Sequence, residues 1–176
     1  MLALFFCFTA FVLLLFVTIS SPTWDSISFL NVSTNYGSTH FGVFGFSGGK
    51  VHVGFHFLVP VIGYDYLAIE GSHLHALTYT LVLYPIATGI SACALIAGVG
   101  AAHNRRAGTI IMTLFAGLAL LLALAAWVLS MVLFGTARIR FDEQGIEATW
   151  GNANWLGLGA LVALTITYIA AWRDRR

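Results

Sequence analysis

Charged residues are scarce in this chain. Of its 176 residues, 59% are hydrophobic and only 9% are charged, whereas soluble domains carry roughly 25% charged residues. The eight basic and seven acidic side chains leave a net charge of +1, so the sequence offers no basic surface of the kind that nucleic acid requires. The composition therefore predicts an integral membrane protein surrounded by lipid and argues against a nucleic-acid-binding one.

Cysteine is almost absent as well. The chain contains two, Cys7 and Cys93, and both lie inside apolar runs. A disulfide framework or a thiolate metal site would need cysteines gathered in exposed loops. The sequence therefore predicts neither.

Catalytic and ion-conducting signatures are missing too. The sequence has no nucleophile elbow, no HExxH motif and no phosphate-binding glycine loop. Its long apolar runs contain no ionisable side chain, which would be the usual mark of a proton or ion path. A bis-histidine haem would need histidines within facing spans, and only His75 and His103 come near, at opposite ends of one run. We therefore predict a non-enzymatic protein without cofactor or metal, and neither a transporter nor a pump.

Long apolar runs, by contrast, are plentiful. A helix crosses a hydrocarbon core of about 30 Å with about 20 apolar residues. We predict four transmembrane helices in one membrane domain, over residues 2–20, 75–102, 109–134 and 154–172. Pro85 lies inside the second run and predicts a kink there. A cleaved signal peptide remains the alternative interpretation of the first run, since Thr18 and Ser20 could flank a cleavage site.

Lys and Arg orient these helices. Arg105 and Arg106 lie in the short link between the second and third spans, and three arginines follow the fourth. Short segments rich in Lys and Arg face the cytosol. We therefore expect both termini in the cytosol and residues 21–74 as an outer loop. This loop contains the sequon Asn31-Val32-Ser33, which makes Asn31 a candidate for glycosylation.

The outer loop has a β-strand pattern. Residues 41–57 read FGVFGFSGGKVHVGFHF, in which two short alternating segments flank the turn residues Ser47, Gly48 and Gly49. Alternation with a period of two is typical of a strand with one buried face. The fold class is therefore an all-α four-helix membrane bundle with a small β-hairpin in its first outer loop.

Five of the six histidines gather in or beside the same loop. They are His40, His52, His56, His73 and His75. Histidine changes charge near neutral pH, so one interpretation is a pH-responsive surface, and the other is a set of ordinary solvated polar residues. A metal site is disfavoured, because His52 and His56 would lie about 13 Å apart on a strand.

The order of these features resembles the fungal PalI family of tetraspan plasma-membrane proteins, which are grouped with eisosome-type tetraspan proteins and have a claudin-like layout. The resemblance rests on an uncharged first span, on the loop motifs Phe41-Gly42-Val43-Phe44-Gly45-Phe46 and Ile62-Gly63-Tyr64, and on the Tyr84-Pro85 step. Two features depart from the family. Ser47 stands where members resemble one another in having cysteine, so a loop disulfide is excluded, and only four residues follow Trp172, where members often have a long polar tail.

The resemblance implies an accessory component of fungal ambient-pH sensing, a multi-pass plasma-membrane protein that assists a larger multi-span sensor. Its expected partners are membrane lipid and that sensor, or a further copy of itself. The alternative is a membrane-organising or cell-contact protein of the eisosome or claudin type, in which the loop mates with a neighbour and senses no proton.

Overall fold

The computed structural model describes most of the chain and forms two compact units. The described residues are 2–21, 23–24, 26–34, 37–47, 58–59, 67–68, 77–100, 105–143 and 145–174. The first unit, here called the helical unit, consists of Met1–Thr18, Leu83–Ala126 and Trp155–Arg176. The second, the sheet unit, consists of Ile19–Val82 and Trp127–Asn154.

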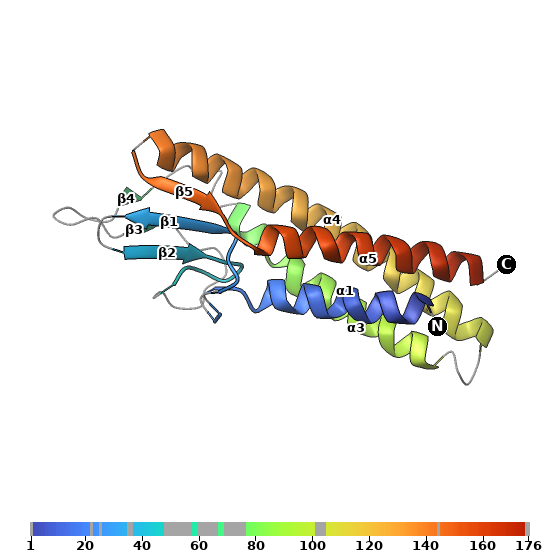
Figure 1. The fold of residues 1–176 in the computed structure, drawn as a ribbon. Helices are drawn as coiled ribbons and strands as arrows, with labels where there is room; N and C mark the ends of the chain where they lie inside the picture. The colour runs from blue at the N-terminus through green and yellow to red at the C-terminus, as the bar shows by residue number, and fades with distance from the viewer. Residues whose placement is uncertain are drawn as a thin grey trace. The chain divides into compact units, whose positions relative to one another are not determined.

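Four helices follow the four apolar runs (Figure 1). They are α1 (Leu2–Thr18), α3 (Leu83–Gly100), α4 (Arg105–Glu143) and α5 (Ala153–Asp174). Among the described residues, three stretches are long and apolar enough to cross a membrane, namely Leu77–Gly100, Gly108–Glu143 and Ala153–Arg173, while α1 is shorter at 17 residues. The predicted count of four helices is confirmed for the part of the chain that the structure describes.

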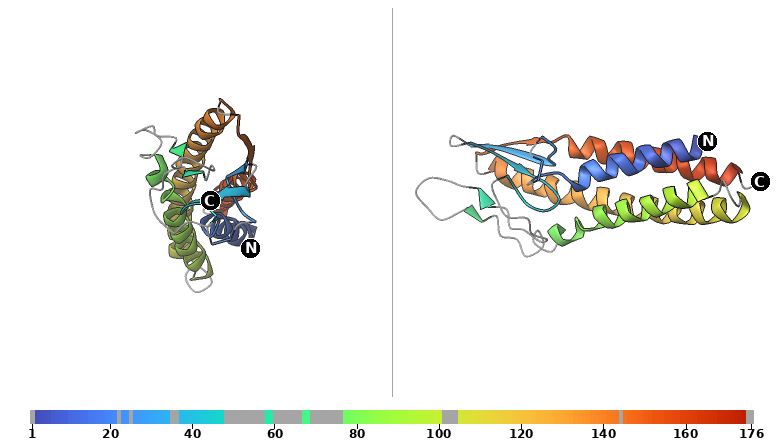
Figure 2. Two further views of the ribbon diagram at one scale, coloured as in Figure 1. Left: turned by 90° about the vertical axis from the view of Figure 1, so that its left-hand side faces the viewer. Right: turned by 90° about the horizontal axis from the view of Figure 1, so that it is seen from below.

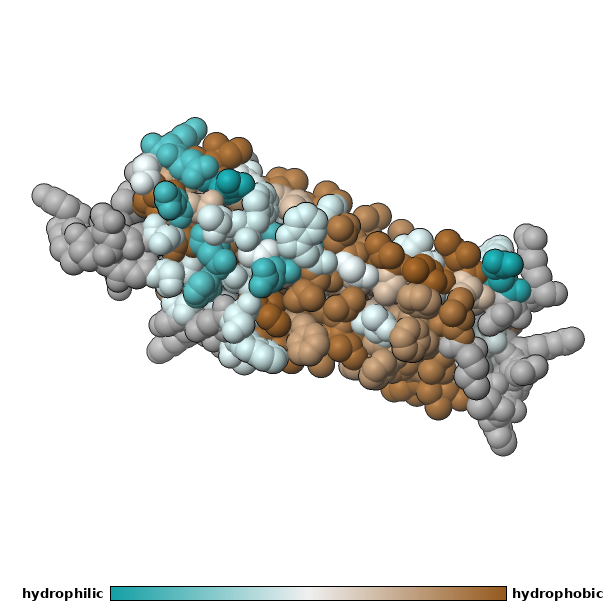
Figure 3. Space-filling model, in the orientation of Figure 1, coloured by the Kyte–Doolittle hydropathy of each residue, from teal (hydrophilic) through white to brown (hydrophobic). Residues whose placement is uncertain are grey.

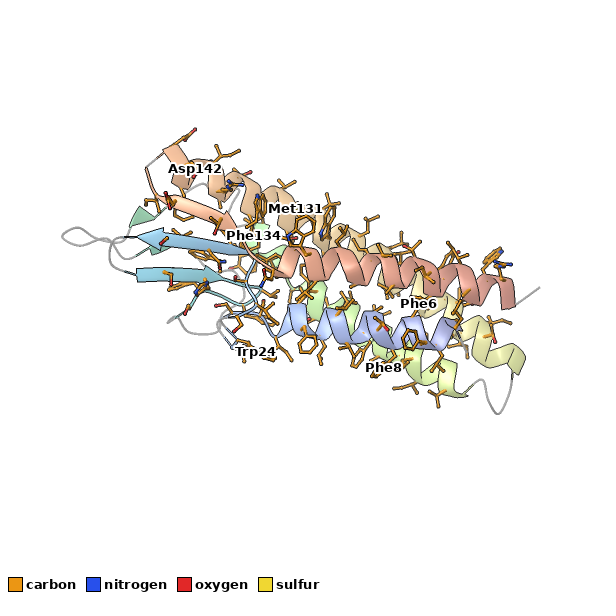
Figure 4. The ribbon with its side chains drawn as sticks, viewed as in Figure 1. Phe6, Phe8, Trp24, Met131, Phe134 and Asp142 are labelled. Carbon is orange, nitrogen blue, oxygen red and sulfur yellow. The ribbon has the colours of Figure 1, made fainter. Side chains whose placement is uncertain are left out.

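Small side chains let the helices of the helical unit pack closely. Its core is formed by Ala3, Cys7, Ala94, Met112, Ala116 and Ala171. The helices α1 and α3 are also joined by a 2.9 Å hydrogen bond between the hydroxyls of Thr18 and Thr88. Some larger apolar side chains point outward, as Phe8 does with 52% of its surface exposed (Figure 4).

The outer surface of the helical unit suits lipid. Its visible face is mostly hydrophobic (Figure 3). Trp155 and Trp172 are both exposed and are 17 residues apart on α5, about 26 Å along a helix. Exposed tryptophans at such a spacing mark the two interfaces of a bilayer. The beginning of α1 and the end of α5 lie at the same end of this unit (Figures 1 and 2), as an even number of spans requires.

The helix break at Pro85 lies just before the proline. Residues 77–80 form a helical turn, residues 81–82 interrupt it, and α3 begins at Leu83. The proline ring clashes with the carbonyl four residues earlier, which belongs to Leu81. Pro85 therefore occupies the first turn of α3, where its missing N–H leaves no hydrogen bond unmade.

The helix α4 is longer than the predicted third span. It begins at Arg105 and continues to Glu143, nine residues past the expected end at residue 134. The sequence prediction ended the span with the uncharged apolar run, because the charged residue Arg138 follows that run. Beyond that run the helix is stabilised by packing, since Phe134, Ala137 and Phe141 are fully buried.

A three-stranded antiparallel sheet joins the two loops expected on the outer side. Its strands are β1 (Leu30–Thr34), β2 (Gly37–Phe41) and β5 (Glu147–Trp150), in the order β2-β1-β5. A second pair consists of β3 (Leu58–Val59) and β4 (Leu67–Ala68). The strand β5 was not predicted, although Glu147 to Trp150 alternates between polar and apolar residues in the manner of a half-buried strand.

The hairpin of the first loop lies earlier than predicted. It is formed by β1 and β2, and Phe41 is its last residue, whereas the sequence prediction made Phe41 the first. After Phe41 the chain bends, because the N–H of Gly42 donates to the carbonyl of Gly45. Residues 48–57, the rest of the predicted hairpin, lie outside the described residues.

Candidate functional site

The sheet β2-β1-β5 has one buried and one polar face. Leu30, Val32, Phe41 and Ala148 are buried on one side. The other side contains only polar residues, which the strand pairing places together: Asn31, Ser33, Ser38, His40, Glu147 and Thr149. The visible surface of this unit is correspondingly more hydrophilic than that of the helical unit (Figure 3). We call this set of six residues the polar face.

The aromatic side chains of α4 hold the buried face. Phe134 stacks on Phe29 with ring centroids 5.0 Å apart and planes 7° from parallel. Seven residues further along α4, Phe141 contacts Phe41 at a ring-centroid distance of 6.2 Å. Phe134 points from α4 toward the strands (Figure 4). The polar face is thus presented by a sheet that is anchored from behind.

Asn31 and His40 are hydrogen-bonded across the polar face. They are register partners on β1 and β2, and Nδ1 of His40 lies 2.7 Å from Oδ1 of Asn31. The hydroxyl of Ser28 donates to the same Oδ1. Because an amide oxygen only accepts, the hydrogen of this bond belongs to His40 Nδ1.

The sequon is arranged so that its reactive atom is available. Both hydrogen bonds that the Asn31 side chain makes with described residues end on Oδ1, so none of these residues engages Nδ2, the atom that would carry a sugar. Ser33, the third sequon residue, is exposed on the same face. The site is therefore compatible with glycosylation at Asn31, which stays a prediction.

The first residues of the motif Phe41 to Phe46 are packed against the segment that precedes β1. Phe41 and Val43 are buried, and a Cβ on Gly42 would overlap with the backbone carbonyl of Ser21. The N–H of Val43 donates to the hydroxyl of Ser20 at 3.0 Å. These contacts fix the chain against the segment that precedes β1.

The second half of the motif folds back on β2. Gly45 has a φ of 147°, a backbone conformation that residues with a Cβ atom rarely adopt. Phe46 forms an isolated antiparallel bridge with Phe41. Phe44, which lies between these two residues in the sequence, is partly buried. The N–H of Ser47 donates to the carbonyl of His40 at 2.8 Å. Backbone bonds and aromatic packing thus hold this segment without a cysteine at position 47.

A buried asparagine was missed by the sequence analysis. Asn154, at the start of α5, donates from Nδ2 to the carbonyl of Phe29 at 3.2 Å, and its own carbonyl accepts the indole N–H of Trp127 at 3.2 Å. Asparagine is common near helix starts, which was the available signal. These two bonds join the residue before β1, α4 and the start of α5 within the sheet unit.

Several predicted site residues lie outside the described residues. These are His52, His56, His73, His75, Ile62, Gly63 and Tyr64. Among the residues that the structure does describe, no three His, Cys, Asp or Glu side chains gather as a metal site would require.

The model of the SUR7/PalI family matches residues 1–170. The chain belongs to the SUR7/PalI family. This membership and the apolar helices make it a multi-pass membrane protein. No curated protein matches the chain.

Proposed function

We propose that this SUR7/PalI protein is a non-enzymatic accessory component of ambient-pH sensing at the fungal plasma membrane, where it assists a larger multi-span sensor. The observation that carries the proposal is the hydrogen bond between His40 and Asn31. It holds the imidazole of His40 in one fixed position on the polar face.

Protonation would change the charge of this face without unfolding it. Nδ1 of His40 already carries the hydrogen that Asn31 accepts, and both the neutral and the protonated ring have an N–H there. The incoming proton goes to Nε2, which changes from an acceptor into a donor. The sheet keeps its structure while the surface seen by a partner gains one positive charge.

Among the described strand residues, one other ionisable side chain shares the polar face with His40. Within β1, β2 and β5, the other ionisable side chain is Glu147, which lies on the same polar face opposite Ser33. The charges near the end of α4 are on the helix that packs against the opposite, buried face. A proton on His40 therefore changes the net charge of the polar face. Such a change in charge is a signal that a sensor protein bound to this face could recognise.

Growth at alkaline pH tests the proposal. A fungal strain lacking its own PalI-like protein is expected to regain growth when this chain is expressed. His40→Gln should reach the cell surface at the same level but restore growth less well, whereas Ser26→Gln, an exposed control outside the polar face, should behave as the parent. Replacing all five histidines in or beside the loop should abolish the rescue of growth at alkaline pH. These are His40, His52, His56, His73 and His75. Surface expression of the parent chain without rescue would contradict the pH-sensing role.

A second candidate is a membrane-organising protein of the eisosome or claudin type. It is favoured by a line of exposed apolar side chains along α4, which includes Val132 and Ile139. In this case clustering at the cell surface should be unaffected by pH and by His40→Gln.

A further inference from the structure

The side chain amide of Asn31 is held by two donors. The hydroxyl of Ser28 donates to its Oδ1, and Nδ1 of His40 lies 2.7 Å from the same oxygen. An amide oxygen has two lone pairs, so these two donors fill its capacity to accept hydrogen bonds. Because an amide group is planar, holding Oδ1 in place also sets the direction in which Nδ2 points.

The two donor residues are themselves held through their backbone carbonyls. The carbonyl of His40 accepts the hydroxyl of Ser21 at 2.9 Å and the N–H of Ser47 at 2.8 Å. The carbonyl of Ser28, which is a buried residue, accepts the N–H of Ala153 at 3.0 Å. Both donors therefore come from well-anchored segments of the sheet unit.

The strand register places Asn31 in the middle of the polar face. It lies on the central strand β1, between His40 on β2 and Thr149 on β5. Thr149 is exposed, and so is Ser33, the next polar-face residue on β1. A sugar joined to Nδ2 of Asn31 would thus stand among short polar side chains, whose hydroxyl groups can hydrogen-bond to it.

We propose that Ser28 and His40 form a clamp that fixes the stem of an N-linked glycan on Asn31. The sugar replaces a hydrogen on Nδ2 and leaves Oδ1 to accept both donors. The reverse orientation of the amide would turn Nδ2 toward Ser28 and His40, where a sugar has no room, so the clamp and the modification require the same orientation. The inference rests on the predicted sequon and does not depend on the pH-sensing role.

A clamped stem should protect the bond that joins the glycan to the protein. A peptide-N-glycosidase hydrolyses the amide bond at Nδ2, which converts the asparagine to aspartate, and it must reach that amide. An endoglycosidase cleaves between the first two sugars, farther from the sheet. In the folded parent chain, we therefore expect slow release by the first enzyme and fast release by the second.

Removal of either donor should open the stem. Ser28→Ala and His40→Phe should each raise the peptide-N-glycosidase rate about two- to tenfold, the factor that corresponds to one hydrogen bond, and leave the endoglycosidase rate unchanged. His40→Gln keeps an N–H donor and should stay close to the parent. Ser26→Ala, at an exposed serine outside the clamp, is the matched control for Ser28→Ala.

The experiment uses the full chain, purified in mild detergent from cells that add high-mannose glycans. A parent chain without a glycan at Asn31 would overturn the proposal, as would peptide-N-glycosidase rates that do not change when a donor is removed. An equal acceleration of both enzymes would also refute it, because that result indicates general loosening of the sheet. Rescue of growth at alkaline pH is a separate measurement, so failure of the clamp and failure of the pH-sensing role are distinguishable.

Discussion

Within the loop motif Phe41 to Phe46, the identity of a single residue, Gly42, is fixed by a tertiary contact. The motif Phe41 to Phe46 suggested a strand by its alternation, but the structure uses it as a bend. Gly42 lies against the backbone of Ser21 so closely that a methyl group does not fit. That contact joins residues 21 positions apart, so no local pattern could reveal it.

Gly42→Ala should therefore destabilise the sheet unit. We expect a loss of about 1–3 kcal/mol, because backbone rather than a flexible side chain must move. Gly89→Ala in α3 is the control, since a Cβ there has nothing within 4 Å. The measurement is the midpoint of thermal unfolding in detergent, and equal midpoints for the two variants would contradict the role assigned to Gly42.

Among secondary-structure elements, the outer half of α4 depends most on its neighbours. The apolar run predicted the helix only to residue 134, yet the helix continues to Glu143. Its continuation is stabilised where Phe134 stacks on Phe29 and where Phe141 meets Phe41. The strand β5 likewise exists because β1 supplies its hydrogen-bonding partner.

Phe134→Ala should loosen the sheet from α4. Truncation of a buried phenylalanine costs about 3–5 kcal/mol, and Phe134 is fully buried. We expect faster proteolysis and faster hydrogen exchange in β1 and β5. The matched control is Phe8→Ala on the outside of α1, which should leave both rates unchanged. Unchanged exchange in the strands of the Phe134 variant would show that the aromatic stack does not hold the sheet.

For the whole molecule, the decisive property is its orientation in the membrane. The beginning of α1 and the end of α5 lie at one end of the helical unit (Figure 1). The arginines of the short link and of the tail predict that this end faces the cytosol. The sequon at Asn31 belongs to the sheet unit, which the same prediction places outside.

Glycosylation and terminal tags together test this orientation. The chain should migrate more slowly when made in cells that glycosylate, and enzymatic deglycosylation, Asn31→Gln or Ser33→Ala should each abolish that shift. Tags at both termini should be inaccessible to antibody in intact cells and accessible after permeabilisation. A tag exposed on intact cells would reverse the predicted topology.

The sequence by itself determined the membrane class, the four helices and the candidate residues. Long uncharged runs demand lipid whatever their neighbours, because burying apolar side chains and pairing backbone groups within a helix are local requirements. It did not locate the hairpin, the continuation of α4, β5 or the contacts of Asn154. Only the tertiary structure decided these, because strand pairing and aromatic stacking join residues more than 100 positions apart, such as Phe29 and Phe134. The pairing of His40 with Asn31 is of the same kind, since a hydrogen bond across two strands depends on their register.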